Sequence, residues 1–257
     1  MYVSKIDRKV GIEVYATKTP GISGIIKYFA EDFIVEEMLV NGSKASINHN
    51  EVLLQDLKNH RTLTDYLLCV LVKRDKDNFL AIKALAKGLG LRAEDIQIAG
   101  IKDTRAVTAQ HITLRKVSVE DLQKVSINGI EVHPIGFFHT KISPYYLLGN
   151  QFRIIIRNIR HSRTTIKERI SKTISELRKI GGIPNFFGHQ RFGTRRPITH
   201  LVGKAIVKGN LEKAAMIFLA KAMPYENPES QIVRKQLWET GDFKQALKDF
   251  PKRLHYE

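Results

Sequence analysis

Residues 99–110 hold the side chains of this chain whose types and spacing are best suited to chemistry. Gly100 opens a short polar segment in which Lys102, Asp103 and Arg105 stand almost side by side. Neighbouring cations favour the ionised form of a carboxylate, so Asp103 is predicted to stay charged and to serve as a nucleophile or base. The alternative is a β-turn with surface charges, because short motifs of this kind also arise by chance.

The composition indicates a polyanionic partner. Of the 257 residues, 42 are Lys or Arg and 26 are Asp or Glu, which gives a formal net charge of +16 and a pI near 9.9. Such a charge is typical of proteins that bind nucleic acid or an acidic membrane surface. The strongest apolar run, residues 66–72, has the length of a strand and is too short to cross a bilayer. The N-terminus lacks the apolar core of a secretion signal, so we expect a soluble, cytoplasmic protein that binds RNA or DNA.

Motifs for cofactor chemistry are missing from the sequence. The histidines show no metal-ligand spacing, and the single Cys69 excludes a cysteine-rich zinc site and is expected to pack as a small hydrophobe. Neither a dinucleotide-binding nor an NTP-binding glycine motif is present, and G-x-S-x-G is absent as well. Any catalysis is therefore predicted to use side chains alone, without a metal, a nucleotide or another cofactor.

Residues 183–193 form a second segment of interest, because rings, amides and glycines are mixed there without period. Glycines permit close backbone approach, and Asn185 and Gln190 can contact the polar edge of a base. Arg195 and Arg196 follow directly and add positive charge. We interpret this segment as a binding loop, since function is concentrated on such loops.

The elements expected to position these residues form an α+β pattern. Strands are predicted at residues 67–72, 96–98 and 111–117, with a helix capped by Asp77 and closed by Gly88 or Gly90. Residues 25–37 are predicted to form one or two strands, and the acids around Phe33 are interpreted as a solvated strand edge.

The second half of the chain is predicted to become progressively helical. Residues 118–150 are predicted to be irregular, with aromatics that either stack on bases or fill a second core. Residues 152–157 are predicted to form a buried strand. A helix with an apolar stripe is expected from about 165 to 180. Short helices follow, one of them capped by Asn210, which suggests a second module from about residue 200.

Three segments, taken in order, resemble the signature motifs of TruD-type pseudouridine synthases. They are residues 31–37 (EDFIVEE), 100–110 (GIKDTRAVTAQ) and 185–193 (NFFGHQRFG). The resemblance extends over about residues 11–257 and is nearest to the archaeal branch. It implies an α+β fold with a mixed, mainly antiparallel sheet and a family-specific insertion. We therefore expect the N-terminal part of a catalytic domain in residues 1–200 and the start of a helix-rich insertion domain in residues 201–257.

The resemblance also implies a reaction, the conversion of uridine to pseudouridine in tRNA, at uridine-13 of the D-arm in most members. In this correspondence Asp103 is the catalytic aspartate and Lys102 its charge partner, while Phe33 and Phe187 line the pocket and Asn185 makes a polar contact. Attack by the aspartate at the sugar C1′ or at the base C6 remains open. The arginines expected to contact phosphate are Arg105, Arg153, Arg191, Arg195 and Arg196.

The end of the chain differs from the family pattern, in which the chain continues past the insertion and returns to the catalytic domain. Here the sequence stops at Glu257, inside the expected insertion. We therefore expect either a fragment or a naturally short or split form. The alternative function is a truncated, non-catalytic tRNA-binding protein or a subunit of a split synthase. The sequence does not predict an oligomeric state.

Overall fold

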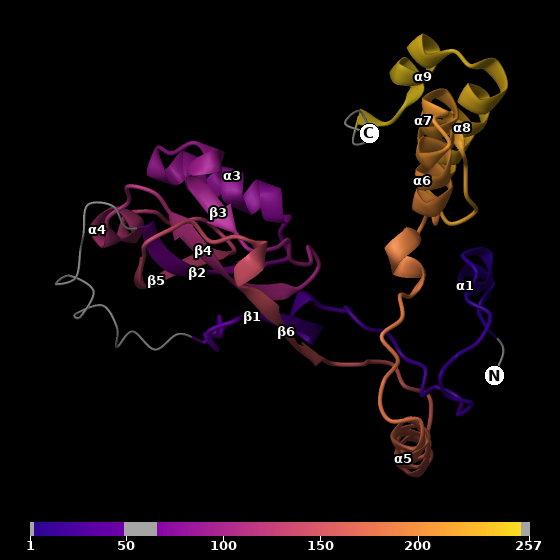
Figure 1. The fold of residues 1–257 in the computed structure, drawn as a ribbon, viewed down its shortest axis with the longest axis horizontal. Coiled ribbons are helices and arrows are strands. Elements are labelled where there is room, and N and C mark those ends of the chain that lie inside the picture. Colours follow the sequence, from indigo (N-terminus) through magenta and orange to yellow (C-terminus); the bar gives the residue numbers. More distant parts are fainter. Residues whose placement is uncertain (1–2, 49–65, 253–257) are drawn as a thin grey trace. The chain divides into compact units, whose positions relative to one another are not determined.

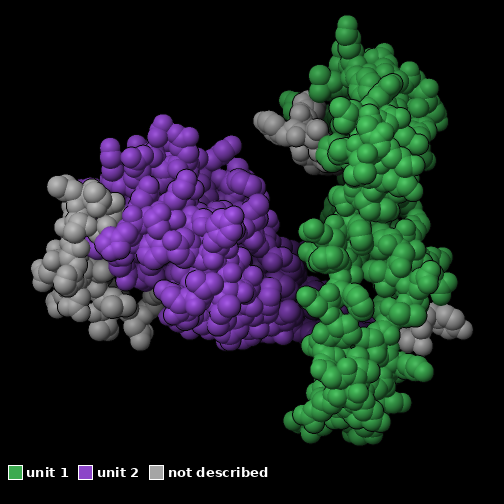
Figure 2. All heavy atoms as spheres, viewed as in Figure 1, with its two compact units in different colours: residues 1–22, 162–257 green, residues 23–161 purple. Residues whose placement is uncertain are grey.

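The chain folds into two compact units, each of which has its own core. The computed structural model describes residues 3–48 and 66–252 (Figure 1). One unit comprises residues 23–161, and the other comprises residues 1–22 together with 162–257 (Figure 2). These units are defined by which residues pack together. The expected boundary at residue 200 instead marks the start of a family-specific insertion. That boundary stays a prediction.

A mixed sheet forms the core of residues 23–161. Its order is β5-β2-β4-β1-β6, and β3 pairs with β4 beside this path. β1 and β4 are parallel, and the other pairings among the described strands are antiparallel, which confirms the expected α+β fold with a mainly antiparallel sheet. The strands are β1 (Phe33–Leu39), β2 (Tyr66–Arg74), β3 (Ile96–Ile98), β4 (Val107–Leu114), β5 (Ile130–Phe138) and β6 (Leu147–Ile154).

Helix α3 (Asn78–Leu89) covers one face of this sheet. It begins as predicted, because the Asp77 carboxylate accepts hydrogen bonds from the backbone N–H groups of Phe79 and Leu80. It ends at Gly90, whose positive φ of 65° suits a glycine. Its apolar side packs on alternate residues of β2 and β4, and the buried Cys69 lies in that cluster as expected. A smaller cluster on other residues of β1, β2 and β4 includes Ile34, Val70 and Val107.

The prediction that residues 118–150 are irregular is wrong. They contain α4 (Val119–Gln123), all of β5 and the start of β6. Proline usually interrupts a strand, but Pro134 lies within β5. β5 is an edge strand, where a missing N–H is tolerated, and its register with β2 shifts beside Pro134.

β6 also differs from expectation, because residues 152–157 were predicted to form a buried strand. β6 ends at Ile154 and lies at the other edge of the sheet, where Phe152 is 50% exposed. The β-branched composition was therefore a correct signal for strand structure but not for burial.

Of the acids near Phe33, Asp32 and Glu37 are fully buried and only Glu31 is exposed, so the interpretation of a solvated strand edge is wrong. β1 lies between β4 and β6 rather than at an edge. Asp32 precedes it and receives two hydrogen bonds from Arg157, at 2.6 and 2.7 Å. These bonds, together with that from the Phe29 N–H, outweigh burial and hold the pKa of Asp32 below its usual value.

The other unit is helical. The helix predicted near 165–180 is confirmed as α5, but none of its residues is buried. The N-terminal segment binds to it, since the Glu176 carboxylate accepts hydrogen bonds from the Lys18 N–H and the Thr19 hydroxyl, both at 2.6 Å. The helices are α1 (Lys5–Lys9), α5 (Arg163–Lys179), α6 (Thr199–Val207), α7 (Leu211–Ala220), α8 (Pro228–Thr240) and α9 (Phe243–Asp249). Within the described residues, no helix is long and apolar enough to span a membrane.

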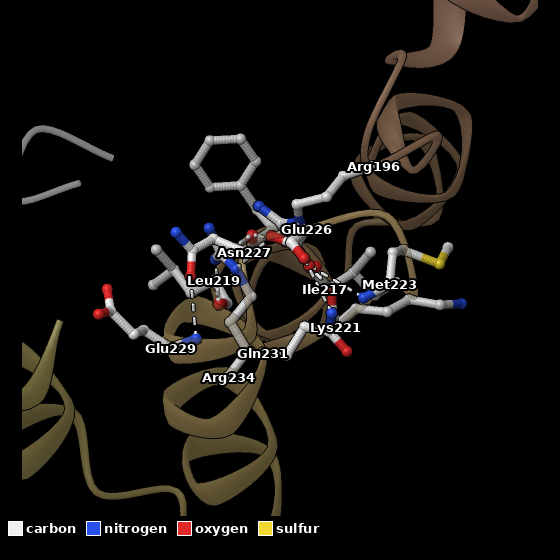
Figure 3. Close-up of polar contacts among 11 residues, drawn as sticks. Arg196, Ile217, Leu219, Lys221, Met223, Glu226, Asn227, Glu229, Gln231 and Arg234 are labelled. Carbon is white, nitrogen blue, oxygen red and sulfur yellow. Dashed lines mark hydrogen bonds and ion pairs between the residues drawn. The ribbon is translucent and has the colours of Figure 1, made fainter. Parts of the chain in front are cut away.

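Two arginines and one glutamate fix the end of α7 (Figure 3). Arg196 and Arg234 both pair with the Glu226 carboxylate, at 3.2 and 2.9 Å. Their guanidinium groups also donate to carbonyls at the C-terminal end of α7, including those of Ile217 and Leu219. Cations stabilise this end of a helix because its carbonyls carry the negative end of the macrodipole. Arg196 is thus engaged in the fold, which is inconsistent with the phosphate contact expected of it.

Candidate active site

Asp103 lies in the loop that joins β3 to β4. The loop is shorter than the sequence suggested, because β4 begins at Val107 and pairs with β1 from there. Neighbouring elements hold the loop at two points. The backbone N–H of Lys102 donates to Asn78 Oδ1 at the start of α3 (3.4 Å), and the carbonyl of Ala106 accepts from Asp75 (3.0 Å). The loop is therefore fixed by hydrogen bonds to the segment that links β2 to α3.

Two lysines from distant parts of the chain hold Asp103. Lys27 Nζ forms an ion pair with the carboxylate. Lys73 Nζ, at the end of β2, donates to the backbone carbonyl of Asp103 at 2.6 Å. The Asp103 side chain stays 31% exposed. The arrangement thus presents a partly accessible carboxylate on a fixed backbone, as a nucleophile or base requires.

Phe33 lies beside this ion pair, because Lys27 Nζ is 4.0 Å from the centre of its ring. A cation over an aromatic face is favourable and can fix the position of both groups. The ring is only 8% exposed. Stacking of a base on the same face of Phe33 would therefore require the ammonium group of Lys27 to move. The pocket-lining role of Phe33 stays a prediction.

Lys102 does not pair with its sequence neighbour Asp103. Its buried ammonium contacts Glu37 Oε2 at 2.5 Å. The other oxygen of Glu37 accepts a hydrogen bond from the His111 backbone N–H at 3.0 Å, and the His111 ring in turn contacts the Ser43 hydroxyl. The prediction that Lys102 is the charge partner of Asp103 is therefore wrong. The ion pair instead ties the loop to β1, and substrate binding by Lys102 stays a prediction.

Glu37 is charged despite complete burial. Burial raises the pKa of Glu37, but the hydrogen bonds from His111 and the interactions with Lys102 outweigh it and leave the pKa below its usual value. The pair stabilises the loop only while both charges are present, because a single buried charge is costly.

Lys73 experiences the opposite balance. Burial dominates and lowers its pKa from the ordinary 10.5 to about 8, although the nearby Asp103 and Asp77 carboxylates act against this shift. A neutral amine retains two hydrogens, which matches its two acceptors, the carbonyls of Lys76 and Asp103. Lys73 can therefore donate to the Asp103 carbonyl whether its amine is protonated or neutral.

The low pKa of Lys73 predicts a specific pH dependence of stability. Between pH 8 and 10.5 the unfolded chain binds more protons at this position than the folded chain, so the free energy of unfolding rises with pH. Lys73→Gln cannot titrate at this position and serves as the reference. Between pH 7 and pH 10, the free energy of unfolding of the unaltered protein should rise by about 2 kcal/mol relative to that of Lys73→Gln. Denaturant unfolding of both proteins measures this difference, and Lys83→Gln on exposed α3 surface is the control. A flat difference would contradict the assignment.

The remaining candidate residues belong to different parts of the molecule. Arg105 lies near Asp103 in sequence, and its guanidinium donates to the Tyr28 carbonyl at 3.0 Å. Asn185, Phe187 and Arg191 belong to the helical unit and are exposed. Phe187 is 69% exposed, and the Arg191 guanidinium lies 5.1 Å from its ring centre. Their roles in substrate binding stay predictions.

The segment at 183–193 ends at a glycine that the fold requires. Gly193 has a φ of +110°, and a Cβ there would lie 2.2 Å from the Arg196 carbonyl oxygen. His189, in the short turn His189–Phe192, contacts the Asp7 carboxylate at 2.8 Å. Up to that turn the segment is irregular and exposed, in agreement with the predicted loop.

Sequence reasoning missed Lys27, Lys73 and the pairing of Glu37. Lys27 carries no local signal, since it follows two isoleucines in a segment that forms only an isolated bridge. Lys73 directly follows the apolar run 66–72, and that position was its one available signal. Glu37 was noted for its charge, but its burial depends on β1 lying inside the sheet.

Comparison with known proteins agrees with these observations. The family model described as tRNA pseudouridine synthase D (TruD) matches residues 9–257. The chain is 39% identical over 257 residues to a protein of Methanosarcina barkeri described as a probable tRNA pseudouridine synthase D, covering all of this chain and 55% of that protein. A similar protein of Archaeoglobus fulgidus is 37% identical over 252 residues, which are 98% of this chain and 56% of the relative.

A solved structure gives the same result for the fold. The crystal structure of the putative tRNA pseudouridine synthase D from Methanosarcina mazei matches with a TM-score of 0.73 and 37% identity, over all of this chain and 55% of that one. The chain thus spans about half the length of the relatives it matches. With the family model covering nearly every residue, the chain belongs to the tRNA pseudouridine synthase D (TruD) family.

Proposed function

We propose that this chain isomerises uridine to pseudouridine in tRNA, at uridine-13 of the D-arm, with Asp103 as the nucleophile. The observation that carries the proposal is the state of Asp103, whose backbone is held by Lys73 while its carboxylate stays partly accessible. Membership of the family supplies the reaction class.

The chemistry needs an accessible carboxylate and a base that has left the stack. Extrusion of the base costs a few kcal/mol, and the pocket must repay it. Attack by Asp103 at C1′ forms an ester bond as the bond from C1′ to N1 breaks. The freed uracil then turns, and C5 bonds to C1′ as the ester bond breaks and releases the carboxylate. Alternatively the carboxylate adds at C6, the bond from C1′ to N1 breaks, and the carboxylate leaves C6 after C5 has bonded to C1′. In both routes C5 loses a proton and N1 gains one, so the reaction needs no external oxidant or reductant.

Charge supports tRNA as the partner. The net charge of +16 favours association with a polyanion, and this attraction should weaken steeply as salt is added. A cytoplasmic location, where tRNA is modified, is part of this proposal.

The direct test is to incubate the chain with an unmodified tRNA transcript and to map pseudouridine by sequencing. Pseudouridine at position 13 is expected, and a transcript with cytidine at that position is the matched control. Modification at another uridine would overturn the site assignment. Salt-sensitive binding without any product would favour the second candidate, a non-catalytic tRNA-binding protein or a subunit of a split synthase.

One observation favours the split-synthase form of that second candidate. The edge strand β6 exposes Phe152 and Ile154, and an exposed apolar edge is suited to pairing with another polypeptide. Product formation only after a second polypeptide is added would support it, whereas full activity of the chain alone would exclude it.

A further inference from the structure

A basic cavity lies in the helical unit, within residues that no part of the proposed reaction uses. It has a volume of about 570 Å³ and is formed by α6, α7 and α8 with the segments that follow α6 and α7. Four lysines and the single tryptophan of the chain line it: Lys204, Lys208, Lys213, Lys221 and Trp238. Its size falls within the range of pockets that bind small molecules.

The lysines gather there because of helical spacing. Lys204 and Lys208 are four residues apart, on and just after α6. Lys213 lies on α7 and Lys221 directly follows it, and both line the same cavity. Among residues 3–48 and 66–252, no carboxylate lies within ion-pair distance of these four ammonium groups, and no acidic residue lines the cavity. Four like charges repel one another, so an anionic ligand would stabilise the arrangement.

Trp238 makes the site more specific than a charged patch. Its side chain is 52% exposed at the cavity, although tryptophan is usually well buried. An indole face beside several cations is the combination that binds unpaired nucleotides, because the base stacks on the ring and phosphates meet the lysines. An acidic protein segment would satisfy the lysines but would gain little from the aromatic face.

The cavity wall is fixed by the buried network at the end of α7. Arg196 donates to the carbonyls of Ile217 and Lys221, and both of these residues line the cavity (Figure 3). Ala205 and Ile217 also belong to the apolar cluster between α6 and α7. The site is therefore held in place by buried contacts before a ligand binds.

We propose that this cavity binds an unpaired nucleotide of an RNA strand, with its base on Trp238 and its flanking phosphates on the lysines. The inference rests on the proposed function in taking RNA as the ligand, and it adds a contact remote in sequence from Asp103. It predicts that RNA binding changes the environment of the only tryptophan.

The test uses the fluorescence of Trp238 together with the anisotropy of a labelled RNA. A single-stranded oligonucleotide and unmodified tRNA are titrated at low salt, and quenching of Trp238 is expected to follow the anisotropy. Lys204→Gln combined with Lys213→Gln should weaken binding about tenfold and lower the slope of log K against log[salt] by about 1.4, or 0.7 per lost phosphate contact. Lys235→Gln with Lys244→Gln, which removes two charges outside the cavity, is the matched control.

The outcomes separate this inference from the proposed function. RNA binding by anisotropy without a change at Trp238 overturns the site but leaves the proposed function intact. No RNA binding and no product would overturn both. Quenching of Trp238 by polyglutamate as strong as that by RNA would reassign the site to an acidic protein segment. Quenching by AMP without any response to RNA would reassign it to a free nucleotide. If the double lysine variant fails to fold, Trp238→Ala replaces it, and unchanged RNA affinity in that variant would also overturn the site.

Discussion

Asp103→Asn is expected to abolish pseudouridine formation and to leave tRNA affinity within about twofold. The amide has nearly the same shape as the carboxylate but is not a nucleophile, so turnover should fall by about 10⁴-fold or more. Affinity should be retained, because a carboxylate facing a polyanion contributes no attraction. Single-turnover assays with saturating enzyme measure the first effect, and anisotropy of labelled tRNA measures the second.

Two further variants make this experiment specific. Asp103→Glu keeps the charge but displaces the carboxylate, so it should bind tRNA normally and react slowly. Glu94→Gln removes an exposed acid paired with Arg92 and should change neither property. Substantial turnover by Asp103→Asn would show that another group attacks the nucleotide. A large loss of affinity would show instead that the Asn variant disturbs the loop.

Lys27 gives an independent check on the same site. Its ammonium pairs with Asp103 and covers Phe33, so it is the group that a substrate would have to displace or share. Removal of Lys27 is therefore expected to free the carboxylate and the ring at once. This consequence was out of reach from sequence, because Lys27 and Asp103 are separated by 76 residues.

The sequence predicted local features well and non-local ones poorly. The caps at Asp77 and Asn210 were correct, because a cap depends on side chains within three residues of it. The loop at Asp103 was located for the same reason. Sheet order was not accessible, and it decides both the burial of Glu37 and the exposure of Phe152. Pairing of strands distant in sequence is set by packing of the whole sheet.

The error at Lys102 has the same origin and a structural consequence. Adjacent residues on an extended loop point in different directions, so Lys102 extends to Glu37 on β1 while Asp103 extends to Lys27. The two residues of the Lys-Asp pair thus have separate tasks. One ties the loop to the sheet, and the other presents the carboxylate.

Lys102→Met is accordingly expected to be the most destabilising of the substitutions considered. It leaves the Glu37 carboxylate buried without its cation, and loss of one partner of a buried pair typically costs about 3–5 kcal/mol. The free energy of unfolding, measured by urea denaturation with circular dichroism, should fall by that amount. Hydrogen exchange should accelerate most in β1 and β4. Lys83→Met, on the exposed side of α3, should stay within about 0.5 kcal/mol.

The double variant Glu37→Gln with Lys102→Met distinguishes a paired charge from simple packing. The amide that replaces the Glu37 carboxylate can still accept the hydrogen bond from the His111 N–H, and no uncompensated charge remains. The double variant should therefore be more stable than the sum of the two single losses predicts, by about 2 kcal/mol. Strict additivity would mean that Lys102 and Glu37 act independently. The position of the loop would then depend on its hydrogen bonds with Lys73, Asp75 and Asn78. If coupling is found and turnover falls in Lys102→Met but recovers in part in the double variant, Lys102 is a positioning residue for Asp103.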